Sequence, residues 1–210
     1  MRIYKKIIVL GAGAIGSLLA AMLSKQYKVI AVGRRQHVEV IKKQGLKITG
    51  LVDQVLQLEA TTVMPSIGEE TIIILTTKAQ VAGLATEMFR KQLRKDMAIV
   101  CIQNGLGSDE VVRSLVNCRV VSVVTYLSAQ MVAPGEIKYV GDGLSYFEKH
   151  DEDIAEIVKK AGLKTKVVSK LAGEIWKKLV FNCVINGLGT IMGVANNELS
   201  DPRLDEIKQS

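Results

Sequence analysis

The feature that most constrains the fold is an apolar run that ends in a glycine-rich turn near the start of the chain. Residues 6–10 read Lys-Ile-Ile-Val-Leu, residues 11–16 read Gly-Ala-Gly-Ala-Ile-Gly, and the small-residue segment SLLAAMLSKQ follows. This order predicts a strand, a tight turn and a helix. An isolated G-x-G-x-x-G match carries little weight, but in this context it predicts a dinucleotide-binding turn.

The three glycines of the turn have different expected roles. Gly11 permits the tight turn, Gly13 lets the backbone approach a pyrophosphate, and Gly16 lets helix and strand pack closely. The phosphates are expected to meet the free N–H groups at the positive end of the helix. An ordinary strand-to-helix turn is the alternative interpretation. The predicted cofactor-binding residues of the turn are Gly11, Ala12, Gly13, Ala14, Ile15 and Gly16.

The following segments continue the alternation of strands and helices. The patterns predict a hairpin in LKITG and VLQLEATTV, one long strand in VVSVVTYLSAQMV and a turn at Pro134-Gly135. Ser108 is the expected cap of the second of two later helices. The alternation predicts an α/β fold, a Rossmann-like, doubly wound, mostly parallel sheet. The remaining expected strands cover 27–33, 71–77 and 97–103, and the expected helices cover 37–45, 80–94 and 109–116.

The second strand ends in Val32-Gly33-Arg34-Arg35, where an NAD-binding fold normally places an acid for the ribose 2′-hydroxyl. An arginine accommodates a 2′-phosphate instead, so we expect NADP(H) rather than NAD. Arg34 is the preferred contact and Arg35 the second choice. A solvated basic loop is the alternative.

Two further loops follow predicted strands at the edge where ligands bind in such sheets. Lys78 follows the most apolar strand, and Asn104 follows the next one. Taken singly, Lys78 could equally be an ordinary exposed lysine, and Asn104-Gly105 could equally be an ordinary turn. Because both stand at the binding edge, we expect both to border the cofactor crevice.

A boundary is expected near residue 170, because the chain beyond residue 171 has an all-helical pattern. We therefore expect an NADP-binding Rossmann-like domain over 1–170 and the start of a helical substrate or dimerisation domain over 171–210. About 40 residues are too few for an independent core, so the second domain is expected to be incomplete.

Composition narrows the classes of partner. The 210 residues carry a formal charge of +7, but Lys and Arg are scattered and aromatic residues make up only 4%, which argues against a nucleic-acid surface. A basic pocket that binds a phosphorylated or carboxylated small molecule is a simpler interpretation of the positive charge than a nucleic-acid surface. No apolar run reaches the roughly 18 residues that span a membrane, and we expect a cytoplasmic protein. The three cysteines suggest neither disulfides nor a metal site and are expected to be buried.

The segment WKKLVFNCVIN, residues 176–186, carries two asparagines although asparagine is a poor helix former. Lys178, Asn182 and Asn186 are spaced by four residues, so on a helix they form one polar stripe opposite an apolar face. A lysine with a lowered pKa can protonate a carbonyl oxygen, and amides bind carboxylate and hydroxyl groups. Polar residues of a plain helix surface or interface are the alternative.

Together these motifs resemble the ketopantoate reductase family (2-dehydropantoate 2-reductase). The matching blocks appear in the family's order over essentially the whole chain, and the last is the most specific: GAGAIG, TTKAQ, QNGLG, SAQMVAPGEI and EIWKKLVFNCVINGLGTIMGVANNEL. The resemblance implies NADPH-dependent reduction of 2-dehydropantoate to pantoate, in pantothenate and coenzyme A biosynthesis.

The resemblance also implies roles for individual residues. Lys178 is expected to be the general acid, and the substrate-binding residues are expected to be Asn104, Lys178, Asn182, Asn186 and Asn196. Lys78, Asn104 and Ala129 are expected to contact the cofactor. In the family, the helical second domain also supplies a serine that binds the substrate and a glutamate that contacts the cofactor. We assign neither role to a residue of this sequence.

The alternatives are a reductase of another branched 2-ketoacid and a catalytically silent, truncated NADP-binding relative. Besides its small-molecule 2-ketoacid substrate, we expect no nucleic-acid, membrane or metal partner. A homodimer is compatible with the exposed apolar face expected on the last helix.

Overall fold

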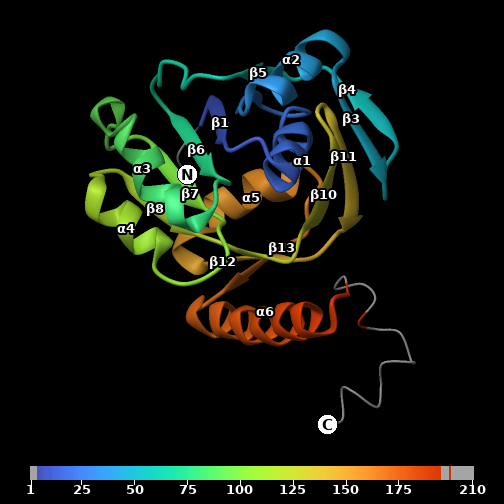
Figure 1. The fold of residues 1–210 in the computed structure, drawn as a ribbon. Helices are drawn as coiled ribbons and strands as arrows, with labels where there is room; N and C mark the ends of the chain where they lie inside the picture. The colour runs from blue at the N-terminus through green and yellow to red at the C-terminus, as the bar shows by residue number, and fades with distance from the viewer. Residues whose placement is uncertain (1–3, 195–198, 200–210) are drawn as a thin grey trace. The chain divides into compact units, whose positions relative to one another are not determined.

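The computed structural model describes residues 4–194 and Leu199, and a six-stranded parallel sheet lies at the centre of residues 4–171 (Figure 1). The chain builds the sheet outward from β1 to β2 and β5, then returns to the other side of β1 for β6, β7 and β8. The strand order therefore reverses between β1 and β6, and the predicted doubly wound α/β fold is confirmed. In spatial order the strands are β5 (Glu59–Thr61), β2 (Lys28–Val32), β1 (Lys6–Leu10), β6 (Thr71–Leu75), β7 (Ala98–Cys101) and β8 (Arg119–Ser122).

Side chains that alternate along the central strands pack into two separate hydrophobic cores, one on each face of the sheet. Ile72 and Ile74 of β6 join the core beneath α1, α2 and α5, whereas Ile73 and Leu75 join the core beneath α3 and α4. All five residues of β6 are buried, as predicted for a strand covered on both faces. The helices are α1 (Ala14–Leu23), α2 (Arg35–Gln44), α3 (Ala82–Glu87), α4 (Ser108–Leu115) and α5 (Glu152–Lys160).

Two smaller sheets flank the central one. Their strand orders are β10-β11-β3-β4 and β13-β12-β9. The predicted hairpin is half right, because β3 and β4 pair antiparallel while β5 leaves to pair with β2. The two sheets consist of β3 (Leu46–Gly50), β4 (Gln54–Leu56), β9 (Val124–Thr125), β10 (Ser128–Ala133), β11 (Glu136–Gly141), β12 (Ser145–Glu148) and β13 (Thr165–Val168).

Three local predictions are wrong. The long strand over 120–132 is divided among β8, β9 and β10, which belong to three different sheets. The helix over 80–94 is broken into the 3₁₀ turn η1 (Ala79–Val81), α3 and the 3₁₀ turn η2 (Arg90–Gln92). Ser108 is the first residue of α4 rather than its cap, since Gly107 occupies the cap position with φ of 83°.

The cysteines also differ from expectation. Cys101 is buried, and burial raises the pKa of its thiol to about 12. Cys118 is half-buried, but Cys183 is exposed, so the expectation of burial is wrong for that residue. Cys183 lies on a helix whose large apolar side chains are largely exposed as well.

That helix is α6 (Ala172–Met192), which forms most of the described part of the second compact unit, residues 172–210. The domains expected over 1–170 and 171–210, with their cofactor and substrate roles, stay predictions. The exposed large side chains of α6 are Trp176, Val180, Phe181, Val184 and Ile191.

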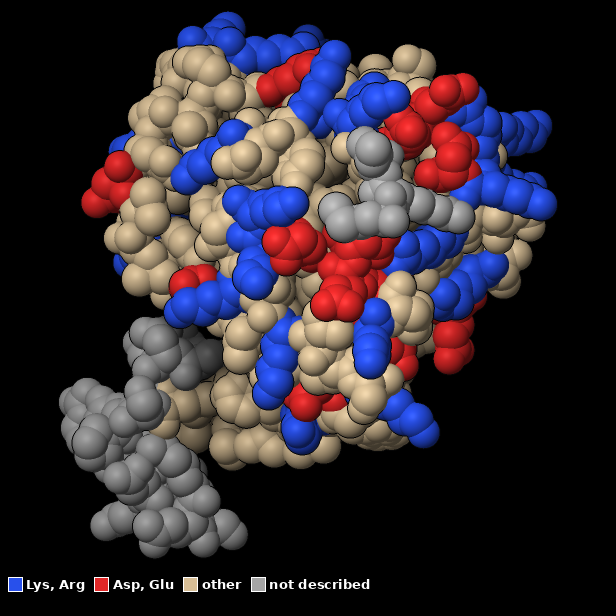
Figure 2. All heavy atoms as spheres, turned by 180° about the vertical axis from the view of Figure 1, so that it is seen from behind, with Lys and Arg blue, Asp and Glu red and all other residues tan. Residues whose placement is uncertain are grey.

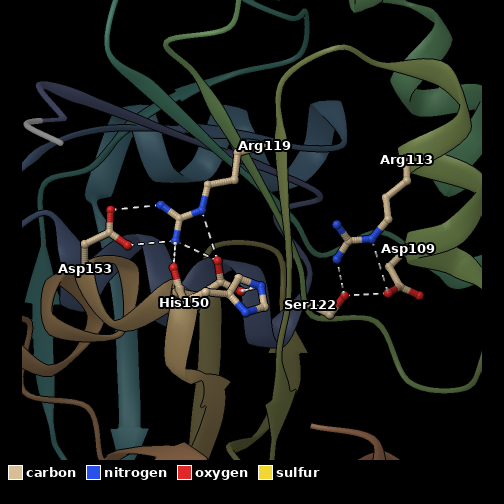
Figure 3. A network of polar contacts seen from close by, with 7 residues as sticks. Asp109, Arg113, Arg119, Ser122, His150 and Asp153 are labelled. Atoms are coloured by element: carbon tan, nitrogen blue, oxygen red, sulfur yellow. Dashed lines mark hydrogen bonds and ion pairs between the residues drawn. The ribbon is translucent and has the colours of Figure 1, made fainter. Parts of the chain in front are cut away.

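A network of ion pairs holds the start of β8 to the segment that leads into α5 (Figure 3). Arg119 donates to Asp151 Oδ1 at 2.6 Å, to Asp153 Oδ1 at 2.8 Å and to the carbonyl oxygen of His150 at 2.7 Å. Burial opposes ionisation of Asp153, but the bonds from Arg119 outweigh it and lower the pKa of this carboxyl. A second network joins Ser122 Oγ to Asp109 at 2.5 Å and to Arg113 at 3.1 Å.

Lys and Arg side chains are dispersed over the face shown in Figure 2, with Asp and Glu among them. Among the helices of residues 4–194, none combines the length and apolar character needed to cross a membrane.

Candidate functional site

Four neighbouring strands of the central sheet end at the same edge, and a predicted site residue follows each of them. In spatial order, Arg34 follows β2, the glycine turn follows β1, Lys78 follows β6 and Asn104 follows β7. All four strands are parallel, so their carboxyl ends lie together. The edge includes the point where the strand order reverses, where crevices that bind ligands form in such sheets.

Two of the glycines in the turn are required by the protein's own packing. Gly11 has φ of 112°, and a Cβ there would lie 2.7 Å from the backbone nitrogen of Thr77. A Cβ on Gly16 would overlap the Gly11 carbonyl and lie 2.5 Å from Thr76 Oγ1. The Thr76 hydroxyl in turn donates to the Gly11 oxygen at 2.6 Å. These contacts hold the turn, α1 and the end of β6 together.

Gly13 has no such requirement. Its φ of −83° suits any residue, and the nearest atom to a Cβ there would be Gly11 O at 3.9 Å. Gly13 is also exposed, at the start of α1. The packing and backbone conformation of the described residues therefore do not require a glycine here, whereas a backbone that a ligand approaches closely does.

The start of α1 presents backbone donors at the same point. The first intrahelical bond runs from Ser17 N–H to the Gly13 oxygen at 2.8 Å, so the preceding N–H groups of the helix, from Ala14 onward, precede the intrahelical ladder. No side chain caps this end, and its first turn carries no acid. This end of α1 therefore suits an anion. Ala12 differs, since its N–H already donates to Val32 O at 2.8 Å.

The two arginines after β2 are in different states. Arg34 is exposed, and its side chain has no hydrogen bond or ion pair with any described residue. Arg35 Nε donates to Glu39 Oε1 at 2.7 Å, four residues along α2. The preference for Arg34 as the contact to a 2′-phosphate therefore gains a physical reason, because only Arg34 keeps its full set of donors.

The other predicted cofactor contacts lie in different settings. Lys78 and Asn104 are exposed, and neither side chain is bonded to another residue of the described ranges. Lys78 caps the 3₁₀ turn η1 rather than a long helix. Ala129 lies outside the central sheet, on β10, where it pairs with Tyr139 of β11. Because α1 packs against β10, Ala129 belongs to a strand that borders the helix of the turn.

Sequence reasoning did not single out two further polar residues at this edge. Thr77 directly precedes Lys78, and Gln103 directly precedes Asn104. The hydroxyl oxygen of Thr77 and both amide atoms of Gln103 are buried and have no hydrogen-bond partner among the described residues. Both residues lie in motifs shared with the ketopantoate reductase family, TTKAQ and QNGLG, and this was the sequence signal that could have identified them. The sequence does not reveal which side chains lack hydrogen-bond partners.

The predicted catalytic stripe lies on α6 as the sequence spacing requires. Lys178, Asn182 and Asn186 are all within this continuous helix, and Thr190 Oγ1 donates to the Asn186 carbonyl at 2.7 Å. Burial lowers the pKa of Lys178 from 10.5 to about 8. Neighbouring Lys177 is instead exposed and paired with Glu174 at 2.9 Å. The remaining predicted substrate contact, Asn196, lies outside the described residues.

Two family models match the chain. The model described as "Ketopantoate reductase PanE/ApbA" matches residues 7–152, and "Ketopantoate reductase PanE/ApbA C terminal" matches residues 170–209. The chain belongs to the ketopantoate reductase family. Both units of this ketopantoate reductase family member therefore carry family sequence, including the glycine turn and the stripe of α6.

Relatives named 2-dehydropantoate 2-reductase, an oxidoreductase, share a third of its residues. The protein of Pyrococcus horikoshii is 33% identical over 93% of this chain and 67% of its own length. That of Archaeoglobus fulgidus is 33% identical over 98% of this chain and 71% of its own length. The family member described here thus spans about two thirds of the length of these relatives.

Solved structures agree with the fold. A ketopantoate reductase of the PanE/ApbA family from Ralstonia eutropha JMP134 has a TM-score of 0.82 and 28% identity, over 90% of this chain and 64% of its own. D-mandelate dehydrogenase with NADH and anilino(oxo)acetate has a TM-score of 0.85 and 25% identity, over 95% and 68%. Ketopantoate reductases use NADPH, so the nicotinamide cofactor predicted from the sequence is confirmed for the family. The roles of individual residues, the homodimer and the cytoplasmic location stay predictions.

Proposed function

We propose that this chain carries the NADPH-binding edge and the proton donor for reduction of 2-dehydropantoate to pantoate. The observation that carries the proposal is the stripe of Lys178, Asn182 and Asn186 on α6, headed by a lysine with a pKa lowered to about 8. It lies within the segment that matches the C-terminal family model. Pantoate formation would place the activity in pantothenate and coenzyme A biosynthesis.

The residues at the sheet edge fit a phosphorylated dinucleotide. The start of α1 would hold the pyrophosphate, with Gly13 admitting its close approach, and Arg34 would pair with the 2′-phosphate. Lys78, Asn104 and Ala129 are the proposed contacts of the remainder of the cofactor. NADPH, when bound, supplies the hydride that forms the new C–H bond at C2 of the ketoacid.

Lys178 completes the reaction by giving its proton to the carbonyl oxygen, which receives the electron pair of the C=O π bond. With a pKa near 8, about nine lysines in ten are protonated at pH 7, and each is a stronger acid than an ordinary lysine. The amides of Asn104, Asn182, Asn186 and Asn196 are the proposed partners of the substrate's carboxylate and hydroxyl groups.

The test is NADPH oxidation that depends on added 2-dehydropantoate, measured for the wild type, Lys178→Ala and Lys177→Ala. We expect Lys178→Ala to lower turnover by orders of magnitude and Lys177→Ala to leave it nearly unchanged, because Lys177 is exposed and paired with Glu174. Wild-type turnover should also fall above pH 8 as Lys178 loses its proton. Tight NADPH binding without any turnover would instead favour a silent cofactor-binding relative.

A second candidate keeps the chemistry and changes the ketoacid. The likeness to D-mandelate dehydrogenase in complex with anilino(oxo)acetate favours it, because mandelate is a different 2-hydroxy acid. Faster turnover of 2-oxo-2-phenylacetate than of 2-dehydropantoate in the same assay would select this alternative.

A further inference from the structure

Three buried polar atoms at the carboxyl edge of the central sheet are not bonded within the described residues. They are the Oγ1 atom of Thr77 and the Oε1 and Nε2 atoms of Gln103. Burying an amide or a hydroxyl without a partner destabilises a fold, and such groups are uncommon in native proteins. Two residues with such groups follow neighbouring strands of the sheet. We therefore look for their partner outside the chain.

Strand register places these two residues level with each other. Leu75 of β6 pairs with Cys101 of β7, and Thr77 and Gln103 stand two residues beyond that pair. One residue of each strand lies between the Leu75–Cys101 pair and these two residues, and each has a contact within the protein. The Thr76 hydroxyl bonds to the glycine turn, and Ile102 packs against the first core. The two unbonded side chains thus follow adjacent strands at equivalent positions.

Their position on the edge indicates which part of a dinucleotide they would meet. Arg34 follows β2 on one side of the glycine turn, whereas Thr77 and Gln103 follow β6 and β7 on the other side. A dinucleotide with its 2′-phosphate at Arg34 and its pyrophosphate at the turn has its other nucleotide over β6 and β7.

We propose that Gln103, assisted by Thr77, binds the carboxamide of the nicotinamide ring and thereby positions the ring for hydride transfer. A glutamine amide offers one acceptor and a donor group, and a primary carboxamide is the complementary group on the cofactor. The Thr77 hydroxyl, which donates and accepts, bonds the same carboxamide or the adjoining ribose. The inference rests on the proposed NADPH-binding function.

Near-isosteric variants of the full chain test it by calorimetry. Gln103→Met and Thr77→Val remove the polar atoms while keeping the approximate shape. We expect each to weaken NADPH binding by about three- to tenfold, the usual effect of losing a neutral hydrogen bond. Binding of adenosine 2′,5′-bisphosphate, which lacks the nicotinamide half, should not change.

A modified cofactor separates the carboxamide from the ribose. The 3-acetylpyridine analogue of NADPH has a methyl group in place of the amide NH₂, so the wild type should bind it more weakly than NADPH. Gln103→Met should lose this discrimination. If Thr77→Val loses it too, Thr77 bonds the carboxamide; if it keeps it, Thr77 bonds the ribose.

Thermal stability without cofactor gives an independent readout. A structural glutamine would destabilise the chain when replaced, whereas Gln103→Met should melt no lower than the wild type because an unbonded polar group is removed. A lower melting temperature, an equal loss of bisphosphate binding, or unchanged NADPH affinity in Gln103→Met would overturn the inference. A wild type that binds no NADPH would overturn the proposed function and, with it, this inference.

Discussion

Replacing Gly13 with alanine separates a glycine kept for a ligand from glycines kept for packing. The added methyl group would meet only Gly11 O, at 3.9 Å, and the backbone at Gly13 is in an ordinary extended conformation. The smaller entropy of the unfolded chain stabilises Gly13→Ala by about 0.4–1 kcal/mol. The poorer helix cap that alanine makes costs a similar amount, about 0.5–1 kcal/mol. The free energy of unfolding should therefore change by less than about 0.5 kcal/mol.

Gly16→Ala is the matched control. Its methyl group overlaps the Gly11 carbonyl and lies 2.5 Å from Thr76 Oγ1, and a backbone carbonyl cannot move aside easily. Overpacking of this kind costs about 1–3 kcal/mol, of which the better helix propensity of alanine returns about 0.5–1 kcal/mol. In a chain of this size each kcal/mol shifts the melting temperature by about 2–4 °C. Gly16→Ala should melt several degrees lower, and Gly13→Ala within about 2 °C of the wild type.

The assay combines thermal unfolding with NADPH titration followed by the fluorescence of the reduced nicotinamide. Gly13→Ala should bind NADPH at least about tenfold more weakly, a loss of about 1.4 kcal/mol, although its fold is intact. Wild-type affinity in Gly13→Ala would refute the reasoning, because the pyrophosphate would then not approach the backbone at this glycine.

Two further predictions use pairs of residues in contrasting states. Arg34→Ala should weaken NADPH binding about tenfold or more and leave NADH binding unchanged. Arg35→Ala should change the binding of neither cofactor, because Arg35 already pairs with Glu39. Equal effects of the two variants in a binding titration would contradict the assignment of the 2′-phosphate contact to Arg34. Burial lowers the pKa of His37 below 6.5, so the unfolded chain binds more protons, and the stability present above pH 6.5 is lost as the pH falls through that value. Urea unfolding midpoints at pH 7.5 and 5.5 should reveal this loss, which should shrink in His37→Gln but persist in the exposed-site control His150→Gln.

The start of the chain was predictable because its determinants are local. The strand, turn and helix over residues 6–23 are specified by an apolar run, a glycine spacing and small residues that are adjacent in sequence. The different roles of Gly11, Gly13 and Gly16 follow from the same spacing, and the packing around Gly11 and Gly16 agrees with them. The spacing of Lys178 and Asn182 on a helix is local in the same sense.

Long-range pairing explains what was missed. The strand β11 lies beside β3, which comes about ninety residues earlier, and Gly135 N–H donates to His37 Nδ1 across 98 residues. The run over 120–127 is mostly apolar because its residues are buried in different cores, so its pattern does not reveal where the chain leaves one sheet for another. The unbonded amide of Gln103 is likewise a property of its surroundings, which a sequence motif does not describe.

The lengths of the outermost strands affect how copies of the chain can associate. The central sheet ends in β5, with three residues, and β8, with four, and β8 begins at Arg119, whose guanidinium is held by Asp151 and Asp153. Short edges with a charged residue in a fixed position are poor templates for a strand from another molecule. Pairing through the edges of the central sheet is therefore disfavoured, both in native assembly and in aggregation. Among the described residues, the exposed apolar side chains of α6 and the six-residue edge strand β10 of the second sheet are surfaces through which copies could still associate.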